Sequence, residues 1–202
     1  MAASDSRRHA LAPPGAARGH QRDSIRAAIL EAATHLLARG GFTALTMRAL
    51  ARRIGVSAPT IYSHFRNKEA LVENLVAQGL ERLADALREA RTGADGSRLG
   101  AVVGAYGRFA EENGALFDLM FPASAATRPS GVQAVAEEFR LAVSEERSLD
   151  FALATWALVQ GAIALDRSGC LPAGTNRDSA IATMLEALVG HGAADSDPGQ
   201  AP

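Results

Sequence analysis

An all-α fold is expected from this sequence on three grounds. Ala and Leu, which are among the strongest helix formers, are abundant, whereas aromatic residues make up only 5 % of the chain. Apolar residues recur at helical spacing in most segments, and no segment alternates apolar and polar residues as a half-buried strand does. The 202 residues, 48 % hydrophobic and 21 % charged, suffice for one large helical domain or for a small domain joined to a larger one.

The first helix is expected to begin near Arg22. The first 20 residues lack periodicity and are rich in Ala, Pro, Gly and Arg, which is typical of a disordered arm. Apolar residues at helical spacing follow, and Gly40 and Gly41 are expected to end the helix. Phe42 and Leu45 are expected to enter the core from the connecting loop.

Two short helices joined by a tight turn are expected next. Thr46 is a suitable N-cap for a helix over Met47–Ile54. Gly55 is expected to end that helix, since glycine accepts the positive φ of a tight turn without strain. Ser57 then opens a third helix that runs to about Phe65.

The spacing within this stretch predicts a helix-turn-helix. Two steeply crossing helices need a small residue at the crossing, which Ala51 supplies four residues before Gly55. Val56 and Ile61 are expected to point inward and close the small core. An unrelated helical hairpin can produce the same spacing, so the spacing alone leaves that alternative open.

The rest of the chain is predicted to be helical as well, giving about nine helices in all. Asn67 caps a long helix from Lys68 to about Arg91, and a flexible break follows it. The further helices are expected at Arg98–Glu112, Gly114–Phe121, Gly131–Glu146, Leu149–Arg167 and Arg177–Val189. Domain limits are accordingly expected at 21–67 and 68–192, with a disordered tail over 193–202.

Charge is distributed unevenly along the chain. Residues 1–70 hold eleven basic and four acidic residues, a net charge of +7, whereas the remainder holds ten basic and eighteen acidic residues, a net charge of −8. This asymmetry indicates that the N-terminal part meets a polyanion and the rest does not.

Several classes of protein are disfavoured. Cys170 is the single cysteine, so an intramolecular disulfide and a cysteine-rich metal site are excluded, and its apolar surroundings suggest a small buried side chain. No apolar run long enough to span a membrane is evident, and Arg7-Arg8 is not followed by the apolar segment of a signal peptide. A cytoplasmic location is therefore expected, with no metal and no cofactor.

The run from Gly40 to Leu75, GGFTALTMRALARRIGVSAPTIYSHFRNKEALVENL, closely resembles the DNA-binding domain of the TetR family of transcriptional regulators. The resemblance includes the Gly-Phe entry, the Thr46 cap, the Tyr62-x-His64-Phe65 ending and the Lys68-Glu69-Ala70-Leu71 segment. It implies a three-helix DNA-binding domain joined by a long helix to a helical ligand-binding and dimerisation domain.

This resemblance implies a DNA-contacting surface around the third helix. In a helix-turn-helix the second helix enters the major groove and its N-terminal half faces the bases. Arg48 can reach either guanine or a phosphate, and Pro59 offers an apolar contact to a thymine methyl group. The expected contacts to double-stranded DNA are Thr46, Arg48, Ser57, Ala58, Pro59, Thr60, Tyr62, His64 and Lys68.

The C-terminal part resembles one TetR subgroup less closely. Trp156 to Gly161 is similar to that subgroup's Trp-x-x-x-His-Gly signature, with Gln160 in place of His, and Gly114 stands in place of a usual Pro. The resemblance implies a homodimer through the last two helices, although burial of both helices within one subunit remains an alternative. Expected walls of a pocket for a small apolar or amphipathic effector are Val102, Tyr106, Phe109, Phe117, Met120, Phe121, Phe139, Trp156 and Gln160.

Two competing functions remain open at this stage. An enzyme is disfavoured because no His, Ser or metal-ligand cluster accompanies Glu111 and Glu112. A helical adaptor that binds protein through the acidic part, and DNA only without sequence preference, is the other alternative. The sequence does not decide between a repressor and an activator, although a repressor that a ligand releases from a palindromic operator is the favoured interpretation.

Overall fold

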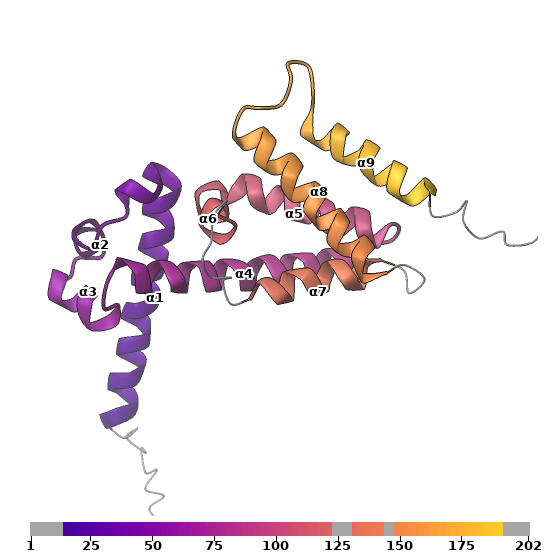
Figure 1. Ribbon diagram of the computed structural model, residues 1–202. Coiled ribbons are helices and arrows are strands. Elements are labelled where there is room, and N and C mark those ends of the chain that lie inside the picture. Colours follow the sequence, from indigo (N-terminus) through magenta and orange to yellow (C-terminus); the bar gives the residue numbers. More distant parts are fainter. Residues whose placement is uncertain (1–13, 123–130, 144–147, 192–202) are drawn as a thin grey trace, which may run out of the picture. The chain divides into compact units, whose positions relative to one another are not determined.

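A computed structural model describes residues 14–122, 131–143 and 148–191, and over these ranges the chain is all-helical (Figure 1). It divides into two compact units, Met1–Leu75 and Val76–Pro202. The all-α prediction is therefore confirmed. The described helices are α1 Pro14–Ala44, α2 Met47–Ile54, α3 Ala58–His64, α4 Lys68–Thr92, α5 Arg98–Glu112, α6 Gly114–Met120, α7 Val132–Ala142, α8 Leu149–Arg167 and α9 Arg177–His191.

The start of α1 differs from the expectation. The helix begins at Pro14 rather than near Arg22, so the last part of the expected disordered arm is helical. Pro is tolerated in a first helical turn because its missing N–H has no partner there. The remainder of the expected arm and the expected tail lie outside the described residues. At the other end Gly41 has φ 64° and ψ −167°, so the helix is interrupted where the glycine pair predicted its end.

The core of the N-terminal unit contains one residue fewer than expected. Leu45 is fully buried beside Leu50 and Ile61, but the Phe42 side chain is 48 % exposed. Lys68 explains the difference, because its ammonium lies 3.6 Å from the centroid of the Phe42 ring and donates a hydrogen bond to the Phe42 carbonyl at 2.9 Å. Phe42 therefore holds a cation at the surface instead of filling the core.

In the second unit, α5 packs against α6, α7 and α8, and α8 packs against both α7 and α9. Buried apolar side chains of α4 and α5 supply much of the core, among them Leu80, Leu83, Leu87 and Val102. Close packing of α6 on α4 depends on Gly79, where an added Cβ would lie 2.8 Å from the Met120 sulfur.

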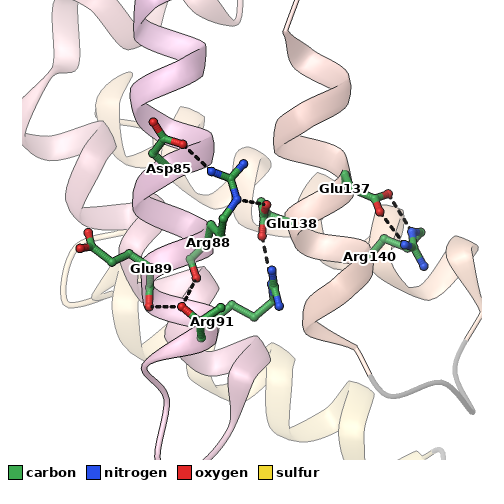
Figure 2. Close-up of polar contacts among 8 residues, drawn as sticks. Asp85, Arg88, Glu89, Arg91, Glu137, Glu138 and Arg140 are labelled. Atoms are coloured by element: carbon green, nitrogen blue, oxygen red, sulfur yellow. Dashed lines mark hydrogen bonds and ion pairs between the residues drawn. The ribbon is translucent and has the colours of Figure 1, made fainter.

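Glu138 joins α7 to α4 through two guanidinium groups (Figure 2). Its carboxylate is almost completely buried and accepts hydrogen bonds from Arg88 Nε at 3.1 Å and from Arg91 Nε at 2.9 Å. Arg88 also pairs with Asp85 on its own helix. A buried carboxylate needs such partners, because desolvation of an unpaired charge is costly.

One arginine at the end of α8 and one at the start of α9 fix these helices in the C-terminal unit. Arg167 pairs with Asp118 of α6 through Nε at 2.9 Å and Nη2 at 2.6 Å. Arg177, which is buried, donates to Glu111 of α5 at 2.6 Å and to its neighbour Asp178. The first turn of α9 is therefore anchored on α5.

One expectation about the C-terminal half is wrong. Cys170 is exposed rather than buried, because it lies in the polar turn between α8 and α9. Within the described residues one helix, α8, is long and apolar enough to cross a membrane by length and composition, and its apolar run is bounded by Asp150 and Asp166. Length and composition alone are weak grounds for a membrane span.

Candidate nucleic-acid interface and effector site

The turn between α2 and α3 has the local geometry that a helix-turn-helix requires. Thr46 caps α2 by accepting a hydrogen bond from the backbone N–H of Ala49 at 3.2 Å. Gly55 ends α2 in the left-handed region, with φ 72° and ψ 31°, and its N–H donates to the Ala51 carbonyl. Ser57 caps α3 by accepting from the backbone N–H of Thr60 at 3.3 Å. The predicted caps and the predicted turn are thus present.

The polar face of α3 is open to solvent. Ser57 and Pro59 are exposed, Ala58 and Thr60 are half-buried, and Tyr62 is 52 % exposed. Ile61 is fully buried on the opposite face, and Val56 is half-buried, so the expected inward packing is complete for Ile61 and partial for Val56. The short side chains of α3 leave its backbone accessible to a close partner.

A cleft of about 540 Å³ lies beside the start of α3. Three of the residues expected to contact DNA line it together, Thr46, Arg48 and Ala58. Arg52 lines it as well, although nothing in the spacing favours Arg52 over its neighbour Arg53. The fold therefore adds one cation to the expected surface, because only a three-dimensional arrangement shows which face of α2 borders α3.

Arginines of α1 hold the end of α3. Arg26 donates to the His64 carbonyl at 3.1 Å, bonds Asn74 of α4, and lies over the Phe65 ring at 4.4 Å. Arg22 donates to the Ser63 carbonyl at 3.4 Å. These contacts occupy the carbonyl groups at the C-terminal end of α3, where a helix would otherwise present unpaired acceptors. Sequence reasoning missed both roles, because the spacing of α1 says nothing about its partners.

His64 and Lys68 are each held by the N-terminal unit itself. Partial burial, together with the nearby charges of Arg22 and Arg26, lowers the pKa of His64 below its ordinary value of 6.5. The ammonium of Lys68 lies over the Phe42 ring and donates a hydrogen bond to the Phe42 carbonyl. The start of α4 is capped by Asn67, which accepts from the backbone N–H of Ala70 at 2.9 Å.

In the C-terminal unit, five of the expected pocket residues form one aromatic cluster. Tyr106 lies at its centre, 5.5 Å between ring centroids from Phe117 and 5.5 Å from Phe139, both at steep angles. Phe121 is 4.9 Å from Phe117 and 6.2 Å from Trp156, and Trp156 stacks on Phe139 at 6.0 Å. We call Tyr106, Phe117, Phe121, Phe139 and Trp156 the aromatic cluster.

Polar groups meet at one edge of the aromatic cluster. The Tyr106 hydroxyl donates to Gln160 Oε1 at 2.5 Å, and burial raises the pKa of Tyr106 well above its usual value. The indole N–H of Trp156 is close enough to favour the ionised tyrosine slightly, yet it does not reach hydrogen-bond geometry. Among the described residues the Trp156 Nε1 is a buried side-chain donor without an acceptor.

Three further expected pocket residues are buried, and two of them are engaged elsewhere. Phe109 lies under the guanidinium of Arg82 and faces a groove shared with Ala86 and Ala90 of α4. Met120 packs on Gly79 of α4. Val102 is fully buried in the core. The structure thus gathers Gln160 with the aromatic cluster and places Phe109 and Met120 against α4.

The outward face of α8 is apolar. Leu149, Leu153, Leu158 and Leu165 are each more than a third exposed, and the small residues Ala157, Gly161 and Ala164 lie between them. A Cβ added at Gly161 would meet nothing within 4 Å. On α9, Ile181 is buried within the unit, Met184 and Leu185 are half-buried, and the side chains of Leu188 and Val189 lie outside the described set. Within the described ranges, no group of three or more His, Cys, Asp or Glu is placed to hold a metal ion.

Two segments of the chain match known protein families. Residues 29–75 match the domain described as bacterial regulatory proteins, tetR family, and residues 99–188 match the tetracyclin repressor-like C-terminal domain. The class D tetracycline repressor protein of Escherichia coli is 40 % identical over 60 residues, which is 30 % of this chain and 28 % of that protein. The transcriptional activator FasR of Mycolicibacterium smegmatis is 34 % identical over 110 residues, which is 54 % of this chain and 50 % of FasR.

A solved structure is similar over nearly the whole length. A Rhodococcus sp. RHA1 protein of unknown function superimposes with a TM-score of 0.69 at 24 % identity, covering 92 % of this chain and 98 % of that one. The chain spans under a third of the repressor and half of the activator. The chain thus carries an N-terminal domain of the tetR regulatory type and a tetracyclin repressor-like C-terminal domain.

Proposed function

We propose that this protein is a ligand-responsive transcriptional regulator that binds a palindromic operator as a homodimer. The observation that carries the proposal is the capped α2–α3 turn, with an open polar face on α3 and a cleft lined by Arg48 and Arg52. This face lies in the part of the chain with a net charge of +7. Cationic surfaces of this kind bind the phosphate backbone, and short helices of this kind enter the major groove.

Individual contacts follow from the exposed positions. Arg48 reaches a guanine edge or a phosphate, Pro59 meets a thymine methyl group, and Ser57 and Thr60 bond bases or phosphates. Tyr62 contacts the phosphate backbone, as do Thr46 and the neutral His64 ring. Lys68 contributes through the N-terminus of α4, since its ammonium is held by Phe42.

The apolar face of α8 forms the dimer interface together with the outer part of α9. A single recognition helix with short side chains binds weakly, and twofold symmetry doubles the contacts on a palindrome. The small residues on this face permit close approach of a second α8. The same face would otherwise be a solvent-exposed apolar stripe, which soluble proteins avoid.

Gly161→Arg tests the dimer. The position faces open space in one subunit, so we expect the subunit to fold as before while the long charged side chain blocks the partner helix. Sedimentation should show monomers for Gly161→Arg and dimers for Gly96→Arg, a matched control at another open glycine. A dimer in both variants would reassign the apolar face of α8.

The effector site is the aromatic cluster with Gln160. A mainly apolar pocket with few polar groups is typical of small-molecule sites. Trp156 to Gly161 corresponds in this proposal to the Trp-x-x-x-His-Gly signature of one subgroup. A regulator that acts on chromosomal DNA is expected in the cytoplasm, and we favour a repressor that the effector releases.

Fluorescence anisotropy on the DNA flanking the protein's own gene tests the central proposal, with random DNA as control. We expect two protomers per palindrome and at least about a thousandfold preference at physiological salt. Arg48→Ala should cost about 1–3 kcal/mol of binding free energy if it reads a base, and the loss should be confined to specific DNA. Arg52→Ala should weaken binding more than Arg53→Ala, because Arg52 is among the residues that line the cleft and Arg53 is not. Equal weak binding to flanking and random DNA would favour the adaptor alternative.

A further inference from the structure

We infer that the aromatic cluster selects a neutral, mainly apolar molecule that carries one carbonyl-type oxygen, which the Trp156 indole N–H binds. The inference rests on the proposed effector site and names the chemistry of its ligand. It starts from a single atom, since Trp156 Nε1 is buried and, although it lies near the Tyr106 hydroxyl, it has no acceptor at hydrogen-bond geometry among the described residues. Buried polar groups are almost always paired, so an unpaired donor marks a place where another molecule supplies the acceptor.

A second donor lies one helical turn away on α8. Gln160 accepts from the Tyr106 hydroxyl through Oε1, and its amide group makes no other hydrogen bond among the described residues. Residues four apart on a helix share a face, so the Gln160 amide N–H groups and the Trp156 N–H lie on the same side of α8. This polar edge therefore offers donors, and the Gln160 oxygen is already occupied. A ligand that accepts hydrogen bonds is complementary to it.

The ligand is neutral because the site supplies no charge to balance an ion. Tyr106 stays protonated, since burial raises its pKa. Nearby charged groups are satisfied on other faces, with Glu138 held by two arginines of α4 and Asp118 held by Arg167. A carboxylate placed among five aromatic rings would lose its hydration without gaining a cation.

An aromatic cage can also hold a cation, but the free donor argues against one here. Ring faces attract a quaternary ammonium group, and cages of three or more rings are used for this purpose. An ammonium group, however, cannot accept a hydrogen bond from Trp156. It would also bring its positive charge against the positive end of the indole N–H dipole. Phe121 and Trp156 are half-buried, whereas Tyr106 and Phe139 are buried, so the cluster is most accessible at Phe121 and Trp156.

Four probes of one shape test the inference on the full-length protein. They are 4-tert-butylacetophenone, the isosteric 4-tert-butyl-α-methylstyrene that lacks the oxygen, 4-tert-butylbenzoate and 4-tert-butyl-N,N,N-trimethylanilinium. Calorimetric titration should give the ketone about tenfold higher affinity than the alkene, the benzoate and the ammonium ion. In Trp156→Phe the ketone should lose that advantage, while alkene affinity stays within about threefold, because Phe keeps an apolar ring but has no N–H donor.

An NMR measurement on the unmodified protein tests the same hydrogen bond without depending on the folding of a variant. Trp156 is the only tryptophan, so a ¹⁵N–¹H spectrum of the unmodified protein holds one indole signal. That signal should move to lower field with the ketone and not with the alkene, because a hydrogen bond deshields the proton. Equal affinities for ketone and alkene, a preference for either ion, or no binding of any probe up to about 1 mM would overturn the inference.

These measurements contain no DNA, so they separate the two proposals. Ketone selectivity without operator binding would support the assigned ligand chemistry and reject the proposed regulatory function. Operator binding without ketone selectivity would support the regulatory function and reject the assigned ligand chemistry.

Discussion

Replacing Glu138 by Gln tests whether the ion-pair cluster of Figure 2 holds α7 on α4. The Glu138 side chain is 4 % exposed and accepts from Arg88 and Arg91. Gln keeps the shape but removes the charge, and its amide NH₂ then faces a guanidinium donor. A hydrogen bond to a charged group contributes about 1.5–3 kcal/mol, and breaking a fully buried pair costs about 3–5 kcal/mol. Since Arg91 is 18 % exposed, we expect a loss of about 2 kcal/mol in the free energy of unfolding.

Urea denaturation followed by Trp156 fluorescence measures this loss, because the single tryptophan lies in the same unit. Glu137→Gln is the matched control, since Glu137 is the neighbouring residue and pairs with Arg140 at an exposed site. We expect it to leave the denaturation midpoint nearly unchanged. A double-mutant cycle should then give stronger coupling of Glu138 to Arg91 than to Arg88, which is half-exposed. Equal midpoint shifts for the two glutamines, or stronger coupling to Arg88, would refute the argument from burial.

Three further predictions concern the N-terminal unit. Thr46→Ala and Ser57→Ala remove the caps of α2 and α3, so each should lower the free energy of unfolding by about 1 kcal/mol, measured by thermal unfolding under circular dichroism. Gly55→Ala should lower it by about 1–2 kcal/mol, because φ 72° strains any residue with a Cβ, and a neutral result would mean that the turn relaxes. The pKa of His64 is lowered in the folded protein, so the unfolded chain binds a proton at higher pH than the folded chain does. The free energy of unfolding should therefore fall as the pH drops below 6.5, and it should fall less in His64→Gln. Identical pH profiles for the two proteins would contradict this prediction.

Local signals made the N-terminal half predictable. Caps and turns depend on residues that are adjacent in the sequence. The helix ends at Thr46, Gly55 and Ser57 were therefore predictable without knowledge of the fold. The start of α1 was missed because Pro14 and the glycines after it favour a loop by propensity, which is only a weak preference.

Contacts between distant residues were not predictable. The apolar character of Phe42 suggested burial, but Lys68, 26 residues later, provides the cation that makes a surface position favourable. Phe109 and Met120 also contact Arg82 and Gly79 of α4, and their spacing did not indicate these partners. Helical spacing shows that two residues share a face, and it does not show which helix that face meets.

Gly114 and Gln160, which replace a usual Pro and His of the resembling subgroup, both affect the polar edge of the aromatic cluster. A side chain at Gly114 would come within 2.5 Å of Arg167 Nη1, so glycine allows Arg167 to reach Asp118 and fix α8 on α6. That contact holds the helix that carries Gln160 opposite Tyr106. A histidine at position 160 would change its charge near neutral pH, whereas glutamine does not. With Tyr106 also protonated, the polar edge keeps one charge state across physiological pH, so it responds to the hydrogen-bonding groups of a ligand and not to acidity.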